Sequence, residues 1–225
     1  MSRSPKAHAG GTSPPGDEGA TLDPGFAATV ASAADDLAAQ GWAMVDGFLE
    51  LAALQVWRGW ALAQRERLAP ARVGRERLLV PTVRGDRTLW VDDLTTLEGG
   101  ALLAARFDAL RIGLNRRCLL GLADLELHLA CYPPGERYAP HHDRVRGDDT
   151  RTLSCVLYLN EAWQSEDGGE LCLYESNDLS GHTHRVLPLG GRLMLFLAEG
   201  CLHEVLPARR ERWSLTGWFR RRAAD

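Results

Sequence analysis

The spacing of hydrophobic positions along the chain changes from three or four residues to two at about Gly121. Before this point, apolar side chains recur at helical spacing from about 25 to a stop at Gly41, over 49–68 and over 101–120. This spacing predicts amphipathic helices. A short strand is expected over 42–48, between the first two helices.

After Gly121 the apolar residues alternate with polar ones, as they do in a strand with one buried face. The predicted strands are short and bounded by Gly, Pro, Asp or Asn, which is typical of an antiparallel sandwich or barrel. They cover 125–129, 153–159, 171–174, 184–187, 192–197 and 213–219. Helices followed by many strands predict an α+β fold in which the helices brace one face of a β-sandwich.

Residues 1–24 contain four prolines and several glycines and serines, but no aromatic or β-branched cluster. Such a segment buries too little apolar surface to offset the entropy of ordering, so we predict a disordered tail. One folded domain is expected over 25–225, with helical support over 25–121 and a β-core mainly over 122–221.

The composition narrows the class of protein. With 225 residues, 45% of them hydrophobic and 25% charged, the chain has the profile of an ordinary soluble globular protein. No apolar run approaches the roughly 18 residues that span a bilayer, and the start lacks the apolar stretch of a secretory signal. We therefore expect a cytoplasmic protein without a membrane partner. The net charge of −4 gives no reason to expect a nucleic-acid partner.

The cysteines are odd in number and include no C-x-x-C pair, which argues against a disulfide framework or a zinc ribbon. Reduced and mostly buried thiols are expected instead. The five are Cys118, Cys131, Cys155, Cys172 and Cys201.

The first candidate for chemistry is the pair His141 and Asp143. In a strand the side chains at i and i+2 point to the same face, so these two would converge while His142 points away. A third ligand must come from elsewhere, and His203, near the end of the 193–197 strand region, is the best candidate. Two histidines and one carboxylate form the facial triad of non-haem Fe(II) oxygenases, which leaves positions open for co-substrate and O₂.

Arg212, nine residues after His203, strengthens an otherwise weak H-x-D signal. If the strand that carries His203 turns at 207–208 and returns as the last predicted strand, alternation gives that strand one common face. This face presents Arg212, Ser214, Thr216 and Trp218. An arginine there can bind a dicarboxylate through two parallel hydrogen bonds, which lysine cannot do. This geometry suits 2-oxoglutarate, whose 2-oxo acid end would chelate iron while the arginine holds its other end.

Further motifs accompany these residues in a fixed order. They are Val83-Arg84-Gly85-Asp86-Arg87 with Trp90, Ala130-Cys131-Tyr132-Pro133, Tyr138, His141-x-Asp143, Gly147-Asp148 with Arg151, Cys155-Val156-Leu157-Tyr158-Leu159-Asn160 with Trp163, Gly168-Gly169-Glu170-Leu171, and His203-Glu204-Val205-Leu206-Pro207-Ala208 with Arg212, Thr216 and Trp218. The series covers roughly 78–219 and resembles the catalytic core of the Fe(II)/2-oxoglutarate prolyl hydroxylases. The closer resemblance is to the hypoxia-inducible-factor prolyl hydroxylases and their bacterial relatives.

This resemblance implies a double-stranded β-helix (jelly-roll) core within a dioxygenase domain over 25–225. It implies Fe(II) and the co-substrate 2-oxoglutarate as cofactors, and a dependence on ascorbate (vitamin C). The implied iron ligands are His141, Asp143 and His203. The implied co-substrate residues are Arg212 and Tyr158 at the distal carboxylate, Thr216 beside them, and Tyr132.

The resemblance also implies substrate contacts at the mouth of the pocket. Trp218 would wall the pocket near iron, and Arg84 would belong to a segment near a peptide substrate. Asp86 would pair with Arg151 and so shape substrate entry.

The predicted function is hydroxylation of a prolyl residue in a protein or peptide, of the prolyl 4-hydroxylase type, using O₂ and releasing succinate and CO₂. One alternative is the same chemistry on another side chain or on a free small molecule. Another is a non-catalytic module that senses metal or 2-oxoglutarate. The remaining histidines are expected to be solvated or hydrogen-bonded: His182 and His184 in a hairpin, and His128 on a strand face.

Overall fold

The computed structural model describes residues 24–72, 78–144, 150–175, 178–181 and 183–223. The tail predicted over 1–24 lies outside these residues, except for Pro24, which begins the first helix. No helix within the described ranges is long and apolar enough to cross a bilayer.

The helices lie close to the segments that hydrophobic spacing predicts. They are α1 (Pro24–Gln40), α2 (Leu51–Ala63) and α3 (Gly100–Cys118), with short 3-10 helices η1 (Arg65–Arg67), η2 (Leu94–Thr96) and η3 (Ser165–Asp167). The second helix ends five residues before the predicted end at 68, because the chain tightens into η1 there.

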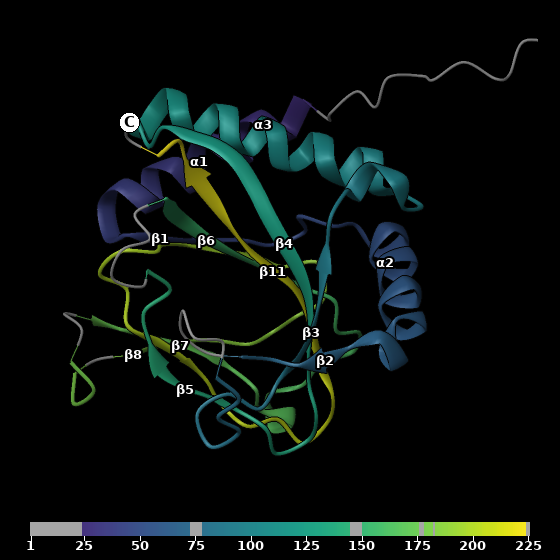
Figure 1. Ribbon diagram of the computed structural model, residues 1–225. Coiled ribbons are helices and arrows are strands. Elements are labelled where there is room, and N and C mark those ends of the chain that lie inside the picture. The colour runs from purple at the N-terminus through teal and green to yellow at the C-terminus, as the bar shows by residue number, and fades with distance from the viewer. Residues whose placement is uncertain (1–23, 73–77, 145–149, 176–177, 182, 224–225) are drawn as a thin grey trace, which may run out of the picture.

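The strands form two antiparallel sheets. The larger has the order β1-β9-β6-β11-β4-β3-β2 and the smaller the order β5-β10-β7-β8. Their bounds are β1 (Trp42–Val45), β2 (Ala69–Pro70), β3 (Arg87–Val91), β4 (Leu122–Tyr132), β5 (Tyr138–His141), β6 (Arg151–Tyr158), β7 (Leu171–Tyr174), β8 (Thr183–Val186), β9 (Leu193–Leu197), β10 (His203–Val205) and β11 (Arg212–Arg221). Figure 1 shows α1 and α3 on one side of the molecule and the small sheet on the opposite side. The predicted α+β, jelly-roll architecture is confirmed.

The large sheet buries both of its faces, and strand alternation separates the two cores. On β6, the side chains of Leu153, Cys155 and Leu157 join the helices in one hydrophobic cluster. The intervening Val156 and Tyr158 point into a second cluster shared with the small sheet. The space between the two sheets is therefore lined by residues of both, and it is here that the polar side chains of the candidate site gather.

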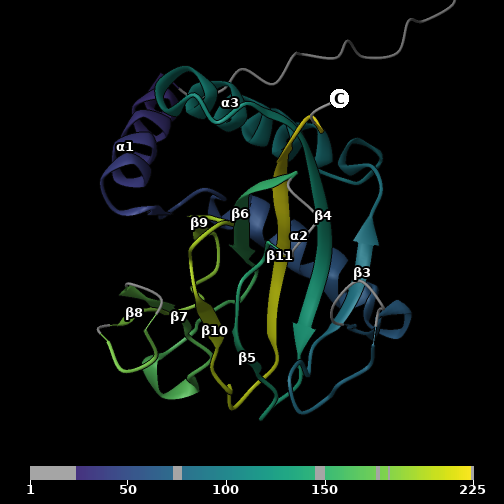
Figure 2. The ribbon, with the colours of Figure 1, turned by 60° about the vertical axis from the view of Figure 1, so that its left-hand side comes forward.

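Two connections differ from the sequence prediction. His203 does not end the 193–197 strand but begins β10, which belongs to the small sheet. The predicted hairpin between this strand and β11 is wrong, since β10 pairs with β5 and β7 while β11 pairs with β4 and β6. Figure 2 shows β10 beside β5 and apart from β11. The chain crosses from one sheet to the other between these strands, as jelly-roll topology requires.

The first half also contributes strands that the sequence prediction did not include. β3 joins the large sheet next to β4, and β2 pairs with it at the edge. The alternation of β3 is weak because only the two-residue β2 covers its outer side, so much of its surface is exposed. The predicted strand over 42–48 is shorter than expected, since β1 ends before Gly47, which has a positive φ of 67°.

Candidate metal centre and co-substrate pocket

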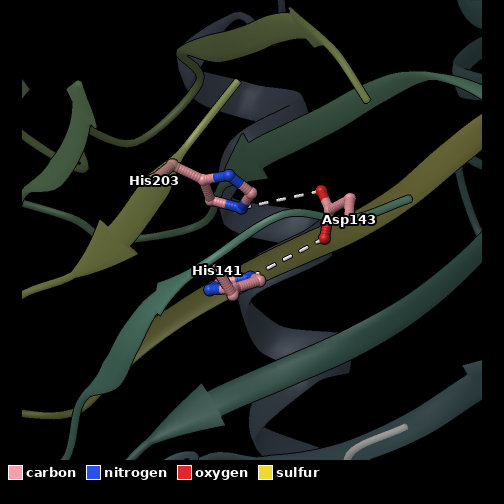
Figure 3. A group of neighbouring side chains, drawn as sticks. All are labelled: His141, Asp143 and His203. Carbon is pink, nitrogen blue, oxygen red and sulfur yellow. Dashed lines mark ion pairs between the residues drawn. The ribbon is translucent and has the colours of Figure 1, made fainter. Parts of the chain in front are cut away.

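His141, Asp143 and His203 come together between the two sheets. His141 ends β5, His203 begins β10, and the two are directly paired across the small sheet. Asp143 Oδ1 lies 3.7 Å from His141 Nε2, and Asp143 Oδ2 lies 3.6 Å from His203 Nε2 (Figure 3). One ligand atom from each residue lies within 4.8 Å of the others, which is close enough for a single metal ion.

Neighbouring groups orient all three side chains. Nδ1 of His141 lies 2.8 Å from the Ala139 carbonyl oxygen, and Nδ1 of His203 lies 3.0 Å from that of Cys201. Because a carbonyl only accepts, Nδ1 carries the proton in each ring and the lone pair of Nε2 points toward the centre. The hydroxyl of Ser154 donates to Asp143 Oδ2 at 2.6 Å. The side chains are thus held in the form and direction that metal ligation needs.

The protonation states also suit a metal. Burial lowers the pKa of His203 to about 4, so its ring is neutral near pH 7. Burial by itself would raise the pKa of Asp143, but the two histidines and Ser154 hold it well below its usual range. Two imidazoles that present Nε2 and one carboxylate are the donor set of the facial triad for Fe(II), so these residues fit an iron site.

Arg212 and Tyr158 present unpartnered donors beside this centre. Both side chains are fully buried, and Arg212 Nη2 and the Tyr158 hydroxyl have no hydrogen-bond partner among the described residues. Arg212 Nε donates to the Gly169 carbonyl oxygen at 2.8 Å, which fixes the guanidinium. Because buried polar groups are normally paired, two such donors indicate a place for an acceptor. A carboxylate fits it, since it accepts from several donors at once.

The same cavity contains the iron-ligand candidates and three of the four predicted co-substrate residues, all but Tyr158. Its walls include the triad together with Tyr132, Arg212 and Thr216. The guanidinium carbon of Arg212 lies 5.3 Å from the centre of the Tyr132 ring, and Thr216 Oγ1 lies 3.0 Å from Ser214 Oγ. The alternation predicted for the last strand therefore places Arg212, Thr216 and Trp218 on one cavity wall.

Known proteins resemble this chain in sequence and fold. Residues 127–220 match the family model described as the 2OG-Fe(II) oxygenase superfamily, where 2OG is 2-oxoglutarate. The crystal structure of a Pseudomonas putida prolyl-4-hydroxylase is 42% identical to the chain, and the match covers 86% of this chain and 100% of that one with a TM-score of 0.76. The chain belongs to the 2OG-Fe(II) oxygenase superfamily.

Two other relatives of this oxygenase extend the comparison. Egl nine homolog 1 of Rattus norvegicus is 29% identical over 147 residues, which is 61% of this chain and 41% of the relative. The chain thus spans about two fifths of that curated relative. A Trichoplax adhaerens prolyl hydroxylase, solved with a hypoxia-inducible-factor peptide fragment, is 24% identical over 87% of this chain and 90% of its own, and its TM-score of 0.73 shows the shared fold.

The mouth of the oxygenase pocket contains the residues predicted to contact substrate, but their pairing differs from the prediction. Arg84 Nε and Nη2 donate to the two carboxylate oxygens of Asp86 at 2.6 and 2.9 Å. Arg151 Nε instead donates to Glu126 Oε1 at 2.9 Å. The expected pair of Asp86 and Arg151 is therefore wrong. Asp86 is 2% exposed, and both of its oxygens are taken by a guanidinium two residues away.

Two residues of the oxygenase site were missed or misread from the sequence. Ser154 is the one serine or threonine in the largely apolar stretch at 153–159, and this was the signal that could have identified it. His128 was expected to be hydrogen-bonded, yet neither ring nitrogen has a partner among the described residues. Its place four residues before Tyr132 on the same face of β4 was the available signal.

The remaining predictions concern the other histidines and the five cysteines. Nε2 of His184 lies 2.9 Å from Glu175 Oε1, which matches the expected hydrogen-bonded role. His182 and the Gly147-Asp148 motif lie outside the described residues. All five cysteines are free thiols, and burial raises the pKa of Cys131 to about 12.

Proposed function

We propose that the protein is a Fe(II)- and 2-oxoglutarate-dependent dioxygenase of the prolyl 4-hydroxylase type, which hydroxylates a prolyl residue in a protein or peptide. The observation that carries this proposal is the facial triad set beside two buried, unpartnered donors. The match to a prolyl-4-hydroxylase at 42% identity over the whole of that chain supports the choice of substrate class.

His141, Asp143 and His203 would hold the iron, and Arg212 and Tyr158 would hold the distal carboxylate of 2-oxoglutarate, with Thr216 and Tyr132 lining its place. When bound, iron and 2-oxoglutarate supply the activation of O₂ that converts a substrate C–H to C–OH and releases succinate and CO₂. The protein's part is binding, orientation and exclusion of water. The full burial of Arg212 serves this last role, because a dry guanidinium binds a carboxylate more strongly than a hydrated one.

The substrate would enter over Trp218, Arg84 and their partners. The guanidinium carbon of Arg84 lies 4.7 Å from the centre of the Tyr138 ring, and that ring stacks on His141 at 3.5 Å between centres. The buried Asp86 carboxylate holds the Arg84 guanidinium in place. The role of Asp86 is therefore to position Arg84 rather than to touch the substrate. Arg151 would position Trp218 in a similar way, because its guanidinium carbon lies 3.5 Å from the centre of the Trp218 ring.

We extend the proposal to ascorbate and to the cell compartment. Ascorbate would restore iron oxidised during turnover without substrate, as the family resemblance implies. A cytoplasmic location is supported by five free thiols, since oxidising compartments favour disulfides.

The test is mass spectrometry of proteins from the source organism after incubation with the purified protein, Fe(II), 2-oxoglutarate, ascorbate and O₂. We expect proline residues that gain the mass of one oxygen atom, and succinate in equal amount. The matched control is Asp143→Asn, which removes one ligand charge and should give neither product. Oxygen on another residue type, or succinate released only with small-molecule extracts, would overturn the prolyl assignment. Absence of succinate under every condition would indicate a sensing module instead.

A further inference from the structure

Four side chains pack against one another across the sheet at the mouth of the site, and the rings of Trp90, His128 and Trp218 each contact the other two. We call this set of side chains the stack. Arg151, at the start of β6, lies over the Trp218 ring of β11 at 3.5 Å. Trp218 stacks on His128 of β4, with ring centres 5.5 Å apart and planes at 29°. His128 in turn lies 5.1 Å from Trp90 of β3. The stack follows the strand register, since Trp90 and Thr216 are the two cross-strand partners of His128.

His128 is the unexplained member of this stack. It is 2% exposed, and both Nδ1 and Nε2 are buried without a partner among the described residues. Burial lowers the pKa of His128 to about 4, so the ring is neutral and offers one donor and one acceptor. Trp218 Nε1, next to it, is a further buried donor with no partner in the described chain. A phenylalanine would stack equally well without burying two unsatisfied nitrogens, so packing alone does not account for a histidine here.

The position of His128 indicates what these nitrogens meet. Tyr132, Arg212 and Thr216 line only the inner cavity, which contains the co-substrate donors. Thr88 and His142 line only the outer cavity, which opens to solvent. His128 and Trp218 line both, together with the triad residue Asp143. They therefore stand where a substrate passing from the outer to the inner cavity comes alongside the metal ligands.

The other side chains at this boundary already have partners. Arg84 is bound to Asp86 and lies against Tyr138, and Tyr138 stacks on His141. Among the described residues at this boundary, the buried polar side-chain atoms without a hydrogen-bond partner are the two ring nitrogens of His128 and Trp218 Nε1. Together they offer two donors and one acceptor, which can pair with the carbonyl oxygens and N–H groups of a peptide backbone.

We infer that His128 is a specificity-determining residue that, with Trp218, binds the peptide bond following the target proline. This inference rests on the proposed function. The two peptide bonds adjacent to the target differ in one respect: the bond before proline has no N–H, whereas the bond after it has one. Only the latter has an N–H that can donate to the acceptor nitrogen of the neutral imidazole. The carbonyl of a trans peptide bond points the other way, so carbonyl oxygens of the bound backbone are left to neighbouring donors such as Trp218 Nε1.

The experiment measures peptide binding as well as turnover. A library of blocked nine-residue peptides with a central proline is first incubated with the wild-type holoenzyme, and the hydroxylated members are identified by mass spectrometry. The dissociation constant of the best peptide is then measured by calorimetry on the zinc-loaded protein with 2-oxoglutarate under nitrogen. The variants are His128→Phe, which keeps the stack, and His128→Gln, which keeps one donor and one acceptor. His184→Phe is the matched control, because His184 lies outside both cavities.

His128→Phe is expected to weaken peptide binding roughly tenfold, while His128→Gln recovers part of the loss and His184→Phe binds as the wild type does. A second peptide, in which an ester replaces the peptide bond after proline, lacks the N–H. The wild type should bind this ester peptide roughly tenfold more weakly than the parent peptide. His128→Phe should bind the ester peptide and the parent peptide equally well. Calorimetry with 2-oxoglutarate alone should give the same affinity for the wild type and His128→Phe.

Several results would overturn the inference. Unchanged peptide affinity in His128→Phe, or an ester penalty equal in wild type and variant, would show that His128 does not contact this bond. Weakened 2-oxoglutarate binding in His128→Phe would place its role on the co-substrate side. If wild type produced succinate but hydroxylated no proline peptide, the proposed function would fail, and this inference with it.

Discussion

The guanidinium carbon of Arg212 lies 5.0 Å from the centre of the Tyr158 ring, and each side chain keeps one buried donor unpaired. The two come from neighbouring strands of the large sheet, β11 and β6. Backbone pairing fixes their separation, since Tyr158 is the register partner of Ser214, two residues from Arg212. The proposed anion site is therefore built on paired strands, which hold its two donors in place before any ligand binds.

The first prediction concerns this anion site. Arg212→Ala should weaken 2-oxoglutarate binding tens- to hundreds-fold, because hydrogen bonds to charged groups contribute about 1.5–3 kcal/mol each. Tyr158→Phe removes one donor without a change of charge and should have a smaller effect. Calorimetry with 2-oxoglutarate measures both affinities. Iron content after dialysis serves as the control and should stay near the wild-type value; unchanged 2-oxoglutarate affinity in Arg212→Ala would refute the assignment.

The second prediction concerns Ser154, whose hydroxyl donates to a carboxylate oxygen of Asp143. Ser154→Ala should lower iron affinity roughly tenfold to a hundredfold, as loss of a group that orients a metal ligand commonly does. Ligand removal in His203→Ala should be more severe and nearly abolish turnover. A competition titration against a chelator measures the affinity. The matched control is Ser214→Ala, a buried serine that bonds Thr216 rather than a triad member; equal losses in the two serine variants would contradict a specific role for Ser154.

The third prediction separates the two candidate partners of Asp86. Arg84→Ala should destabilise the fold by about 3–5 kcal/mol, because it leaves a buried carboxylate without its cation. In Arg84→Ala/Asp86→Asn much of this loss should be recovered, whereas Arg151→Ala and Asp86→Asn should act additively. Urea unfolding of the single and double variants gives the coupling energies. A large coupling between Asp86 and Arg151 would show that the pair implied by the family resemblance forms after all.

Residue spacing predicted the elements that bury an apolar face and the ligands that lie close in sequence. Arg212, Thr216 and Trp218 followed from alternation along one strand. The convergence of His141 and Asp143 was predicted from strand alternation, but β5 ends at His141 and Asp143 lies in a bend two residues further on. Two pairings failed. The partner strand of His203 is set by jelly-roll topology, which local periodicity does not encode. Asp86 was given a distant partner by the family resemblance, whereas Arg84, two residues away, takes both of its oxygens.

His128 shows a different limit of sequence reasoning. On a strand with alternating leucines, a histidine is normally a surface or hydrogen-bonded residue, and burial by strands on both sides cannot be read from β4 alone. Burial of the ring against Trp90 and Trp218, which also contact each other, arises only when β3 and β11 flank β4. The neutral, unpartnered state of this side chain is thus a property of the assembled sheet.

The last prediction tests whether the buried His128 ring is neutral in the folded protein. The pKa of His128 is about 4 in the folded protein against an ordinary value of 6.5, lowered first by burial and then by the nearby Arg84 and Arg151, and opposed by Asp86 and Asp143. Between these two pKa values the unfolded chain binds a proton that the folded chain does not. The contribution of the neutral His128 ring to the free energy of unfolding is therefore fully present above pH 6.5. It is lost as the pH falls toward 4, at about 1.4 kcal/mol per pH unit.

His203 titrates in the same direction, with its own pKa lowered to about 4, so the wild type has at least two groups of this kind in the metal-free state. His128→Phe removes one of them. Urea unfolding of chelator-treated protein at about pH 7.5 and pH 5 should show that wild type loses roughly 2 kcal/mol more than His128→Phe over this range. His184→Phe, at a histidine outside both cavities, is the control for replacing a histidine by phenylalanine. Parallel losses in wild type and His128→Phe would mean that the His128 ring is protonated or solvated in the folded protein, contrary to its burial against the two tryptophans.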